Sequence, residues 1–338
     1  MHRRYLRTCR VECERNVTGF PKKPIVSVII PTYNRAHLIA GAIESVLDQT
    51  YQNFEIIIVD DSSTDKTEEL IKEFIYLDSR VKYFKHDRNK GGSASRNTGI
   101  INARGNFLAF LDSDDIWLPH KIEKQLRIFY QNGPELGAVG SGSIALSGNK
   151  MKNFIPTGKF GNIYKNLLTS LDKDWPGETS TIMIKHECIE KVGLFDELLE
   201  SSQEHDLYIR ISKHYHFDVV REPLVKFFRP KNSITLNLVA KLNGRRRMIE
   251  KYEKDMPKIC KLKSSYSSTA GKILCQQKKM KEGRFYLLKA LLSYPMSLTN
   301  WFVFFLSLLP FPFFKFFHFV NSKLKTIMIN WHWLPSKE

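Results

Sequence analysis

Short apolar runs without polar alternation recur in the first third of the chain. They occupy residues 25–30, 54–59 and 107–111, and a strand buried on both faces of a parallel sheet has this pattern. Residues 81–85 alternate and predict a fourth, shorter strand. The intervening segments predict helices at 38–47, about 66–77 and 93–103, the first from apolar residues spaced along one helix face. This alternation of strands and helices predicts a doubly wound α/β sheet.

Three of the predicted strands end in polar residues. These residues are Thr32 and Asn34, Asp60 and Asp61, and Asp112, Ser113, Asp114 and Asp115. Parallel strands place their carboxyl ends at one edge of the sheet, where ligands bind in open α/β folds. One acidic cluster after a strand is also typical of a solvated turn or a helix N-cap. Three polar strand ends at one edge favour a site, and carboxylates there can hold a divalent cation that binds a diphosphate.

The segment from 119 to 236 is less regular. A helix is expected from Pro119 to about Tyr130, and the polar stretch 144–177 is expected to form a variable lid or pocket wall. Gly140-Ser141-Gly142 lacks the third glycine of a dinucleotide-binding motif and is interpreted as a loose strand or bulge. No P-loop motif is present, which disfavours phosphoryl transfer. Further elements are expected as a strand at 179–184, a capped helix at 201–212 and a strand at 216–220.

The composition changes beyond residue 236. Residues 237–292 are rich in Lys and Arg and helical in pattern, whereas 301–320 are dominated by aromatic residues. The second stretch is long enough to span a bilayer, but its prolines and Lys315 disfavour a spanning helix. Two interpretations stay open: an anchor lying in the membrane surface, which we favour, or a docked helix whose aromatic side chains are core.

Positive charge is concentrated at the two ends of the chain. Of the net charge of +17, residues 1–24 carry +5 and residues 241–338 carry +14, so the stretch between them is close to neutral at −2. This distribution suits ends that meet an anionic membrane surface or polymer. A nucleic-acid-binding protein would carry basic residues interleaved with aromatics on its folded face. We therefore expect no nucleic-acid partner.

The cysteines indicate a reducing compartment. They are odd in number and widely scattered, at Cys9, Cys13, Cys188, Cys260 and Cys275, so free thiols are expected. The first two lack a second ligand pair at zinc spacing. The basic N-terminus is not followed by the apolar segment of a signal peptide. These features predict a cytoplasmic location.

Seven segments carry a combined signature over about residues 25–220. They are VSVIIPTYNR (26–35), FEIIIVDDSSTDKT (54–67), NKGGSASRNTGI (89–100), FLAFLDSDDIWLP (107–119), ETSTIMI (178–184), VGLFDE (192–197) and SQEHDLYIR (202–210). In this order they resemble the family 2 glycosyltransferases, which have the GT-A fold. The resemblance implies a Rossmann-like open mixed sheet. The expected organisation is a basic arm (1–24), a GT-A catalytic domain (25–236) and a helical C-terminal region (237–338).

The resemblance also implies a reaction and a set of roles. The family transfers a sugar from a nucleotide-diphosphate sugar to an acceptor hydroxyl, usually with inversion and with bound Mn²⁺ or Mg²⁺. It implies a metal and ribose motif at Asp112 and Asp114, with Ser113 beside the nucleotide. Asp60 and Asp61 resemble the pair that reads the base and ribose, and a carboxylate accepting the N3–H of uracil would favour a UDP-sugar. The remaining nucleotide-binding residues that it implies are Pro31, Thr32, Tyr33, Asn34, Arg96 and Asn97. Arg96 can equally form a structural salt bridge to Asp60 or Asp112.

The catalytic base is expected at the start of the helix after residue 201. The family commonly has Glu-Asp or Gln-Asp there, and this chain has Gln203-Glu204-His205-Asp206. Glu204 matches the base by position but is longer than the usual aspartate by one methylene, which can change the attack geometry. Asp206 is the second candidate and His205 a weaker third. Glu204 and Asp206 can also be residues that only cap the helix.

The resulting hypothesis is a cytoplasmic glycosyltransferase, peripheral on the inner face of the cell membrane, in surface polysaccharide or glycolipid biosynthesis. Its expected partners are a nucleotide-sugar donor, a glycan or lipid-linked acceptor, and an anionic membrane surface contacted by the C-terminal region. The alternative is a non-catalytic nucleotide-sugar or anion-binding protein with the same fold.

Overall fold

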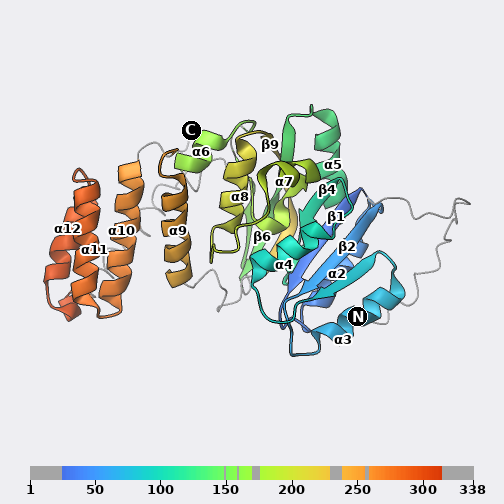
Figure 1. Cartoon of the computed structure of the whole chain (residues 1–338), viewed down its shortest axis with the longest axis horizontal. Coiled ribbons are helices and arrows are strands. Elements are labelled where there is room, and N and C mark those ends of the chain that lie inside the picture. Colours follow the sequence, from blue (N-terminus) through green and yellow to red (C-terminus); the bar gives the residue numbers. More distant parts are fainter. Residues whose placement is uncertain are drawn as a thin grey trace, which may run out of the picture.

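The computed structural model describes residues 25–147, 150–157, 160–169, 176–228, 238–255 and 259–313. In this part of the chain nine strands form one sheet in the order β3-β2-β1-β4-β8-β6-β9-β5, with β7 paired to β6. Figure 1 shows this sheet with the helices around it. The strands are β1 (Val26–Thr32), β2 (Phe54–Asp60), β3 (Val81–Lys85), β4 (Phe107–Phe110), β5 (Asp115–Trp117), β6 (Leu136–Ser147), β7 (Lys150–Phe154), β8 (Met183–Lys185) and β9 (His216–Phe228). β1 to β4 are parallel, and β8 runs antiparallel to both β4 and β6. The expected open mixed sheet is confirmed.

β1 extends beyond its predicted end. It continues through Pro31 to Thr32, although a proline lacks the N–H that a central strand needs. Ile29 is the last residue of β1 that pairs with β4, and its carbonyl accepts from the amide of Leu111. Two residues later, the position of the missing N–H points to the same side, past the end of β4. The proline therefore breaks no ladder hydrogen bond, and Thr32 is carried to the edge of the sheet.

The sheet is covered on both faces, as the unbroken apolar runs predict. One face packs against α2 (Ile39–Leu47), α3 (Thr67–Leu77) and α5 (Lys121–Gln131). The other packs against α4 (Gly92–Ile101), α7 (His186–Val192) and α8 (Gln203–Ser212). Alternate residues of β1 and β2 enter the two cores, so that Ile29 and Ile57 lie in one and Ile30 and Ile58 in the other. Both predicted faces of the parallel strands are therefore buried.

The middle of the chain departs from the predicted elements. Residues 179–184 do not form one strand: Thr179–Thr181 is a 3₁₀ turn, and only Met183–Lys185 is a strand. The stretch expected as a lid, 144–177, contains the end of β6, which pairs antiparallel with β7, and then α6 (Tyr164–Thr169). The expected irregularity at 140–142 is confirmed, because the β6–β9 register shifts there. The prediction of a side-chain cap for α8 is wrong, since Ser202 has a left-handed backbone (φ 64°) and caps nothing.

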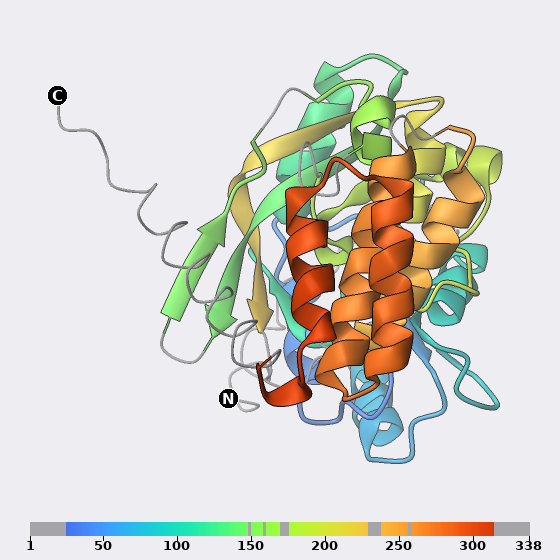
Figure 2. The same cartoon turned by 90° about the vertical axis from the view of Figure 1, so that its left-hand side faces the viewer.

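Among the described residues, four helices follow the sheet in a row. They are α9 (Leu238–Tyr252), α10 (Ile259–Gln276), α11 (Met280–Ser293) and α12 (Leu298–Leu308), and α10 to α12 stand side by side as a layer (Figures 1 and 2). A Cβ on Gly271 would lie 2.8 Å from the carbonyl oxygen of Gly283, so α10 and α11 touch through their backbones. α9 differs from the outer three helices because Met248 and Tyr252 enter a core of the sheet.

The described part of α12 has one packed and one open face. Val303 and Leu306 are buried against α10 and α11, while Phe302 and Phe305 are exposed. Among the described residues, none of the helices is both long and apolar enough to cross a membrane. The rest of the predicted anchor, 314–320, lies outside the described residues, as does the arm at 1–24. Cys188, Cys260 and Cys275 are free thiols, as expected.

Candidate active site

The loops after β1 and β2 are tied together at the edge of the sheet. The amide of Asn34 donates to Ser63 Oγ (2.8 Å), and Asn34 Oδ1 accepts from the amide of Thr64 (2.8 Å). Asn34 holds a left-handed backbone, with φ 52°, which asparagine tolerates better than most residues. The amide of Arg35 donates to Thr67 Oγ1 (3.0 Å). The predicted loop under a nucleotide is thus fixed to the loop that carries the first acidic pair.

Asp60 and Asp61 are buried, and both carboxylates already hold protein groups. Asp60 accepts from the amide of Ser63 (2.9 Å) and from the Tyr83 hydroxyl (2.8 Å). Burial and the hydrogen bond to Asp60 raise the pKa of Tyr83. Since each carboxylate oxygen has two lone pairs, Asp60 can still accept from a ligand.

Asp61 organises the turn that leads into α4. Its Oδ1 accepts from the amide of Lys90 (2.8 Å) and its Oδ2 from the amide of Gly91 (2.7 Å). Nδ1 of His86 lies 2.8 Å from Asp61 Oδ1, and Nε2 of the same ring lies 2.9 Å from Thr98 Oγ1. Gly91 has a φ of 90°, a conformation that favours glycine. Asp61 therefore sets where α4 begins.

The carboxyl groups of the acidic cluster after β4 lie close enough to repel one another. Burial and the neighbouring charge of Asp112 raise the pKa of Asp114, which Arg35 partly opposes. The same two causes raise the pKa of Asp115, and Ser180 Oγ donates to that carboxyl (2.6 Å). The hydroxyl of Ser180 also accepts from the amide of Asp112 (3.1 Å). The cluster is thus held in place by a residue of the 3₁₀ turn, and a cation would offset its repulsion.

Arg96 joins this cluster to the start of α8. Its Nη2 donates to Asp112 Oδ1 (2.7 Å) and its Nη1 to Gln203 Oε1 (3.3 Å). Burial lowers the pKa of Arg96, but the charges of Asp112 and Glu204 outweigh it, so the net shift is upward. Of the two salt bridges left open by the sequence, the one to Asp112 forms. Arg96 therefore links the predicted metal motif to the helix of the candidate base.

Asn97 turns away from this pocket. Its side-chain amide donates to the carbonyl of Phe195 (3.0 Å) and to Glu197 Oε1 (2.8 Å), while its carbonyl oxygen accepts from the amide of Phe195 (2.9 Å). Phe195 in turn packs edge-on against Phe110 of β4. The structure thus places Asn97 as a support of the 193–197 loop, beside Arg96 but not beside the acidic cluster.

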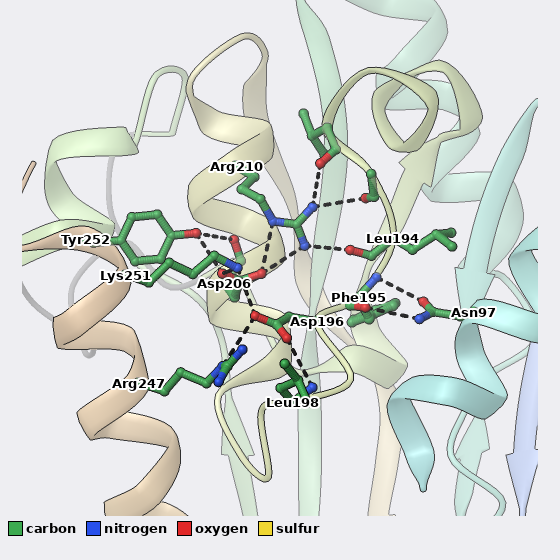
Figure 3. Close-up of polar contacts among 12 residues, drawn as sticks. Asn97, Leu194, Phe195, Asp196, Leu198, Asp206, Arg210, Arg247, Lys251 and Tyr252 are labelled. Atoms are coloured by element: carbon green, nitrogen blue, oxygen red, sulfur yellow. Dashed lines mark hydrogen bonds and ion pairs between the residues drawn. The ribbon is translucent and has the colours of Figure 1, made fainter. Parts of the chain in front are cut away.

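The two candidates for the base lie in different surroundings. Glu204 is half-buried, and its Oε1 accepts from the hydroxyl of Thr179. Asp206 is fully buried and is bonded to Arg210, Lys251 and Tyr252 (Figure 3). The charge of Glu204 helps to raise the pKa of Arg96, which is bonded to Asp112, so Glu204 is the candidate connected to the acidic cluster.

His205 and Tyr208 line the same turns of α8. The ring of His205 is buried, its Nε2 donates to the carbonyl of Leu167 (2.7 Å), and burial lowers its pKa. Burial and the charge of Glu204 raise the pKa of Tyr208. Because its ring is buried and its Nε2 is bonded to Leu167, we favour Glu204 over His205 as the base.

Three buried polar atoms at this edge have no hydrogen-bond partner among the described residues. They are Oγ1 of Thr32, Oγ of Ser93 and Nε of Arg96. A buried polar group without a partner costs about 1–3 kcal/mol, so such groups gather where a ligand completes their bonds. Thr32 ends β1, and Ser93 lies one turn before Arg96 in α4. These atoms indicate a polar ligand at the carboxyl edge of the sheet.

Sequence reasoning missed several supporting residues. Thr179 and Ser180 belong to the segment ETSTIMI and Gln203 to SQEHD, so the motifs contained them without a role. Ser93 lies in NKGGSASRNTGI in the same way. Tyr83 and His86, which bond to Asp60 and Asp61, lie outside every motif, and nothing in the local pattern assigns either of them to the site. The missing signal was the three-dimensional meeting of segments about 70 to 100 residues apart.

The donor set fits a divalent cation with open positions. Within the described residues, no group of three or more His, Cys, Asp or Glu side chains could hold a metal ion by itself. Asp112 and Asp114 supply hard carboxylate oxygens, and Asp112 has an exposed side-chain fraction of 38%. Two carboxylates suit a cation whose other positions are filled by water and by the phosphates of a ligand.

Comparison with known proteins agrees with this geometry. Residues 27–199 match the family model described as "Glycosyl transferase family 2". The chain is 36% identical over 231 residues to the uncharacterized glycosyltransferase MJ1057 of Methanocaldococcus jannaschii, covering 67% of this chain and 78% of that protein. It is 45% identical over 108 residues to WfgD of Escherichia coli, covering 32% of this chain and 42% of that one. WfgD is named a UDP-Glc:alpha-D-GlcNAc-diphosphoundecaprenol beta-1,3-glucosyltransferase.

Two solved structures share the fold. A fragment of S. aureus TarS in complex with UDP-GlcNAc has a TM-score of 0.55 and 17% identity, covering 82% of this chain and 75% of that one. The mannosyltransferase PcManGT from Pyrobaculum calidifontis, in complex with GDP-Man and Mn²⁺, has a TM-score of 0.54 and 16% identity, covering 92% and 88%. Together with the family match and the relative from M. jannaschii, these likenesses show that the chain has the GT-A fold and is a glycosyltransferase of family 2.

Proposed function

We propose that this glycosyltransferase moves a sugar from a UDP-sugar to a hydroxyl of a glycan or lipid-linked acceptor, with inversion, in surface polysaccharide or glycolipid biosynthesis. The observation that carries the proposal is the bridge made by Arg96 between Asp112 and Gln203. It brings the acidic edge and the residue next to Glu204 to the two sides of one guanidinium. A donor on the acidic edge would then lie beside a carboxylate base.

The nucleotide is held at the carboxyl ends of β1, β2 and β4. Pro31, Thr32, Tyr33 and Asn34 form the loop under it, Asp60 and Asp61 face its base and ribose, and Ser113 lies beside it. The unpartnered hydroxyls of Thr32 and Ser93 are available to complete the contacts. Asp112 and Asp114 would hold Mn²⁺ or Mg²⁺, which when bound acts as a Lewis acid that offsets charge on the diphosphate leaving group.

Glu204 serves as the base in this proposal. Its carboxylate takes the proton from the acceptor hydroxyl while that oxygen attacks the anomeric carbon from the face opposite the diphosphate. Thr179 fixes one carboxylate oxygen and leaves the other for the acceptor. A single displacement of this kind inverts the anomeric configuration.

The choice of uridine rests on one property of the site and one relative. The buried Asp60 keeps lone pairs that can accept an N3–H, a donor that uracil has and cytosine lacks. WfgD is named for a UDP-glucose donor and a diphosphoundecaprenol-linked acceptor. A lipid diphosphate acceptor would also match the basic C-terminal region of this chain.

We expect metal-dependent binding of UDP to the purified chain. Calorimetric titrations with UDP, GDP and dTDP, each with Mn²⁺ and with EDTA, test the donor class. UDP should bind in the presence of the metal, and Asp114→Ala should weaken that binding by roughly 10- to 100-fold or more because a ligand is lost. Asp87→Ala, which removes an exposed carboxylate paired with Lys90 at 2.8 Å, is the matched control and should bind as the wild type does.

Other results would revise the proposal. Preference for GDP would replace the proposed donor and keep the mechanism. If UDP binds equally well with EDTA, or equally well to Asp114→Ala, the proposed role of the metal in nucleotide binding is wrong. Absence of binding by every nucleotide would overturn the site as described.

We also propose that the C-terminal region contacts an anionic membrane surface on the cytoplasmic side. The open face of α12 exposes Trp301, Phe302 and Phe305, and residues 241–338 carry 19 Lys and Arg against 5 Asp and Glu. Exposed aromatic side chains next to basic residues suit the headgroup region of a bilayer. An interfacial helix needs no bilayer-spanning length.

Vesicle sedimentation checks this surface. The chain should bind vesicles containing phosphatidylglycerol, bind pure phosphatidylcholine more weakly, and lose much of its affinity at high salt. The pair Phe302→Ser and Phe305→Ser should reduce binding by roughly tenfold or more because apolar contact with the bilayer is lost. Tyr76→Ser on α3, an aromatic that is 92% exposed, is the control. Equal sedimentation of all three proteins would contradict the proposal.

A further inference from the structure

Helix α9 lies directly on the segment that leads into the candidate base. A Cβ on Gly244 would lie 2.6 Å from the carbonyl oxygen of Ser201, so only glycine permits this approach. Nearby, the hydroxyl of Ser201 donates to the carbonyl of Ala240 (3.1 Å). The backbone of α9 therefore touches the chain three residues before Glu204.

The same helix ends on Asp206. Nζ of Lys251 lies 2.6 Å from Asp206 Oδ1, and the hydroxyl of Tyr252 donates to that oxygen (2.7 Å). Nε of Arg210 donates to Asp206 Oδ2 (2.9 Å). Figure 3 shows these three groups around the one carboxylate, which is fully buried. A buried carboxylate needs such partners, and two of the three come from α9.

A second carboxylate extends the contact to the preceding loop. Asp196 Oδ2 lies 3.0 Å from Nζ of Lys251 and 3.6 Å from Nε of Arg247, both on α9. Lys251 thus joins Asp196, in the loop between α7 and α8, to Asp206, in the first turn of α8. Arg210 also donates to the carbonyls of Val192 and Leu194 (2.7 and 2.8 Å). The loop is held from both sides.

The start of α8 has little support of its own. Ser202 makes no side-chain cap, and its φ of 64° is unusual for a serine, so the first turn lacks the usual local stabilisation. At 3.6 residues per turn, Glu204 and Asp206 point about 200° apart around the helix. One therefore faces Thr179 and Arg96 while the other faces α9.

We propose that α9 acts as a brace, a helix that holds the catalytic segment (residues 199–206) in place, and that Lys251 and Tyr252 are positioning residues. They hold Asp206 on the side of the first turn that faces α9. This keeps Glu204, on the opposite side of the same turn, against Thr179. The inference rests on the proposed role of Glu204 as base. An error of about 1 Å in a catalytic group can cost up to roughly 100-fold in rate, so a rotation of this turn would act on turnover.

Two measurements on the full-length chain test the brace. Hydrogen exchange should become roughly tenfold faster over 199–206 in Lys251→Met and in Tyr252→Phe, because local opening there costs less free energy. Exchange in β1 to β4 should not change. Both variants should release UDP from UDP-glucose and UDP-GlcNAc in the presence of Mn²⁺ with a kcat about tenfold below that of the wild type. Their KM for the donor should be unchanged. Lys251→Arg, which can still join the two carboxylates, should restore kcat.

The matched control is Arg246→Met. This residue is a cation of the same helix whose nearest carboxylate is Glu250 on α9 itself (3.8 Å), and the variant should exchange and turn over as the wild type does. Unchanged exchange over 199–206 in both brace variants would overturn the brace. Faster exchange with an unchanged kcat, or a raised KM alone, would overturn the positioning role.

The failure of the proposed function is a separate result. If the wild type binds none of the three nucleotides and releases no UDP from either sugar donor, the proposed function falls, and the positioning role falls with it. Hydrogen exchange still decides by itself whether α9 holds the 199–206 segment.

Discussion

Glu204→Gln is expected to lower sugar transfer by roughly 10²- to 10⁴-fold, the usual worth of a general base. The amide keeps the size of the side chain, and its oxygen can still accept from Thr179, so the first turn of α8 should keep its shape. Glutamine cannot take a proton from the acceptor. Metal-dependent UDP affinity should therefore stay within about twofold of the wild type while kcat falls.

Two further variants sharpen this result. Glu200→Gln removes an exposed carboxylate charge four residues earlier but keeps an oxygen that can accept from Asn243 of α9, so it should leave kcat unchanged. Glu204→Asp restores the residue type that is usual in the family and should keep measurable turnover, lowered or raised according to how the reach of the carboxylate suits the acceptor. Full activity in Glu204→Gln would show that Glu204 is not the base. Binding of UDP without turnover in the wild type would favour the alternative of a non-catalytic nucleotide-sugar-binding protein.

Arg96→Met is expected to lower both stability and kcat/KM. The buried guanidinium holds Asp112 and Gln203, and methionine leaves both without that partner. Since Asp112 is partly exposed, water can solvate it, and we expect a loss of about 2–3 kcal/mol in the free energy of unfolding, below the 3–5 of a fully buried pair. Without the bridge, kcat/KM should fall by roughly 100-fold.

Chemical denaturation and steady-state kinetics check this prediction. Arg104→Met is the matched control: Arg104 pairs with Glu55 at 3.3 Å, but its side chain is largely exposed, so its loss should cost about 1 kcal/mol or less. Arg96→Lys keeps the charge without the two-armed geometry and should lie between wild type and Arg96→Met. Equal stabilities of Arg96→Met and Arg104→Met would show that the bridge is only a surface contact.

The parallel half of the sheet was predictable because its signal is local. The unbroken apolar runs of β1, β2 and β4 predict that both faces of the sheet are buried. The polar residues at the ends of these strands indicate the edge of the sheet that carries the site. The strand predicted at 179–184 was wrong for a different reason. Its alternation matches a strand, but Thr179 and Ser180 bond to Glu204 and Asp115, and a 3₁₀ turn directs both hydroxyls to the site.

The limits of the site prediction follow from the same principle. Glu204 and Asp206 lie two residues apart and are both acidic, so the motif could not distinguish them. Their surroundings are set by distant segments: Thr179 on one side, and Lys251 and Tyr252 on the other. The spacing of two residues in a helix determines the angle between their side chains. The groups that each side chain meets are determined by the packing of distant segments, which the motif does not contain.

The place of Met248 and Tyr252 in the core has a consequence for how this enzyme can be recombined with others. The family match ends at residue 199, yet the core on that face of the sheet is completed by side chains about 50 residues later. Each buried side chain of this size contributes about 1.5–3 kcal/mol. A gene fusion that exchanges the outer helices could therefore join the new segment after Tyr252 and keep this core complete. A junction at residue 236 would remove Met248 and Tyr252, and the new segment would have to fill the space that they occupy in the core.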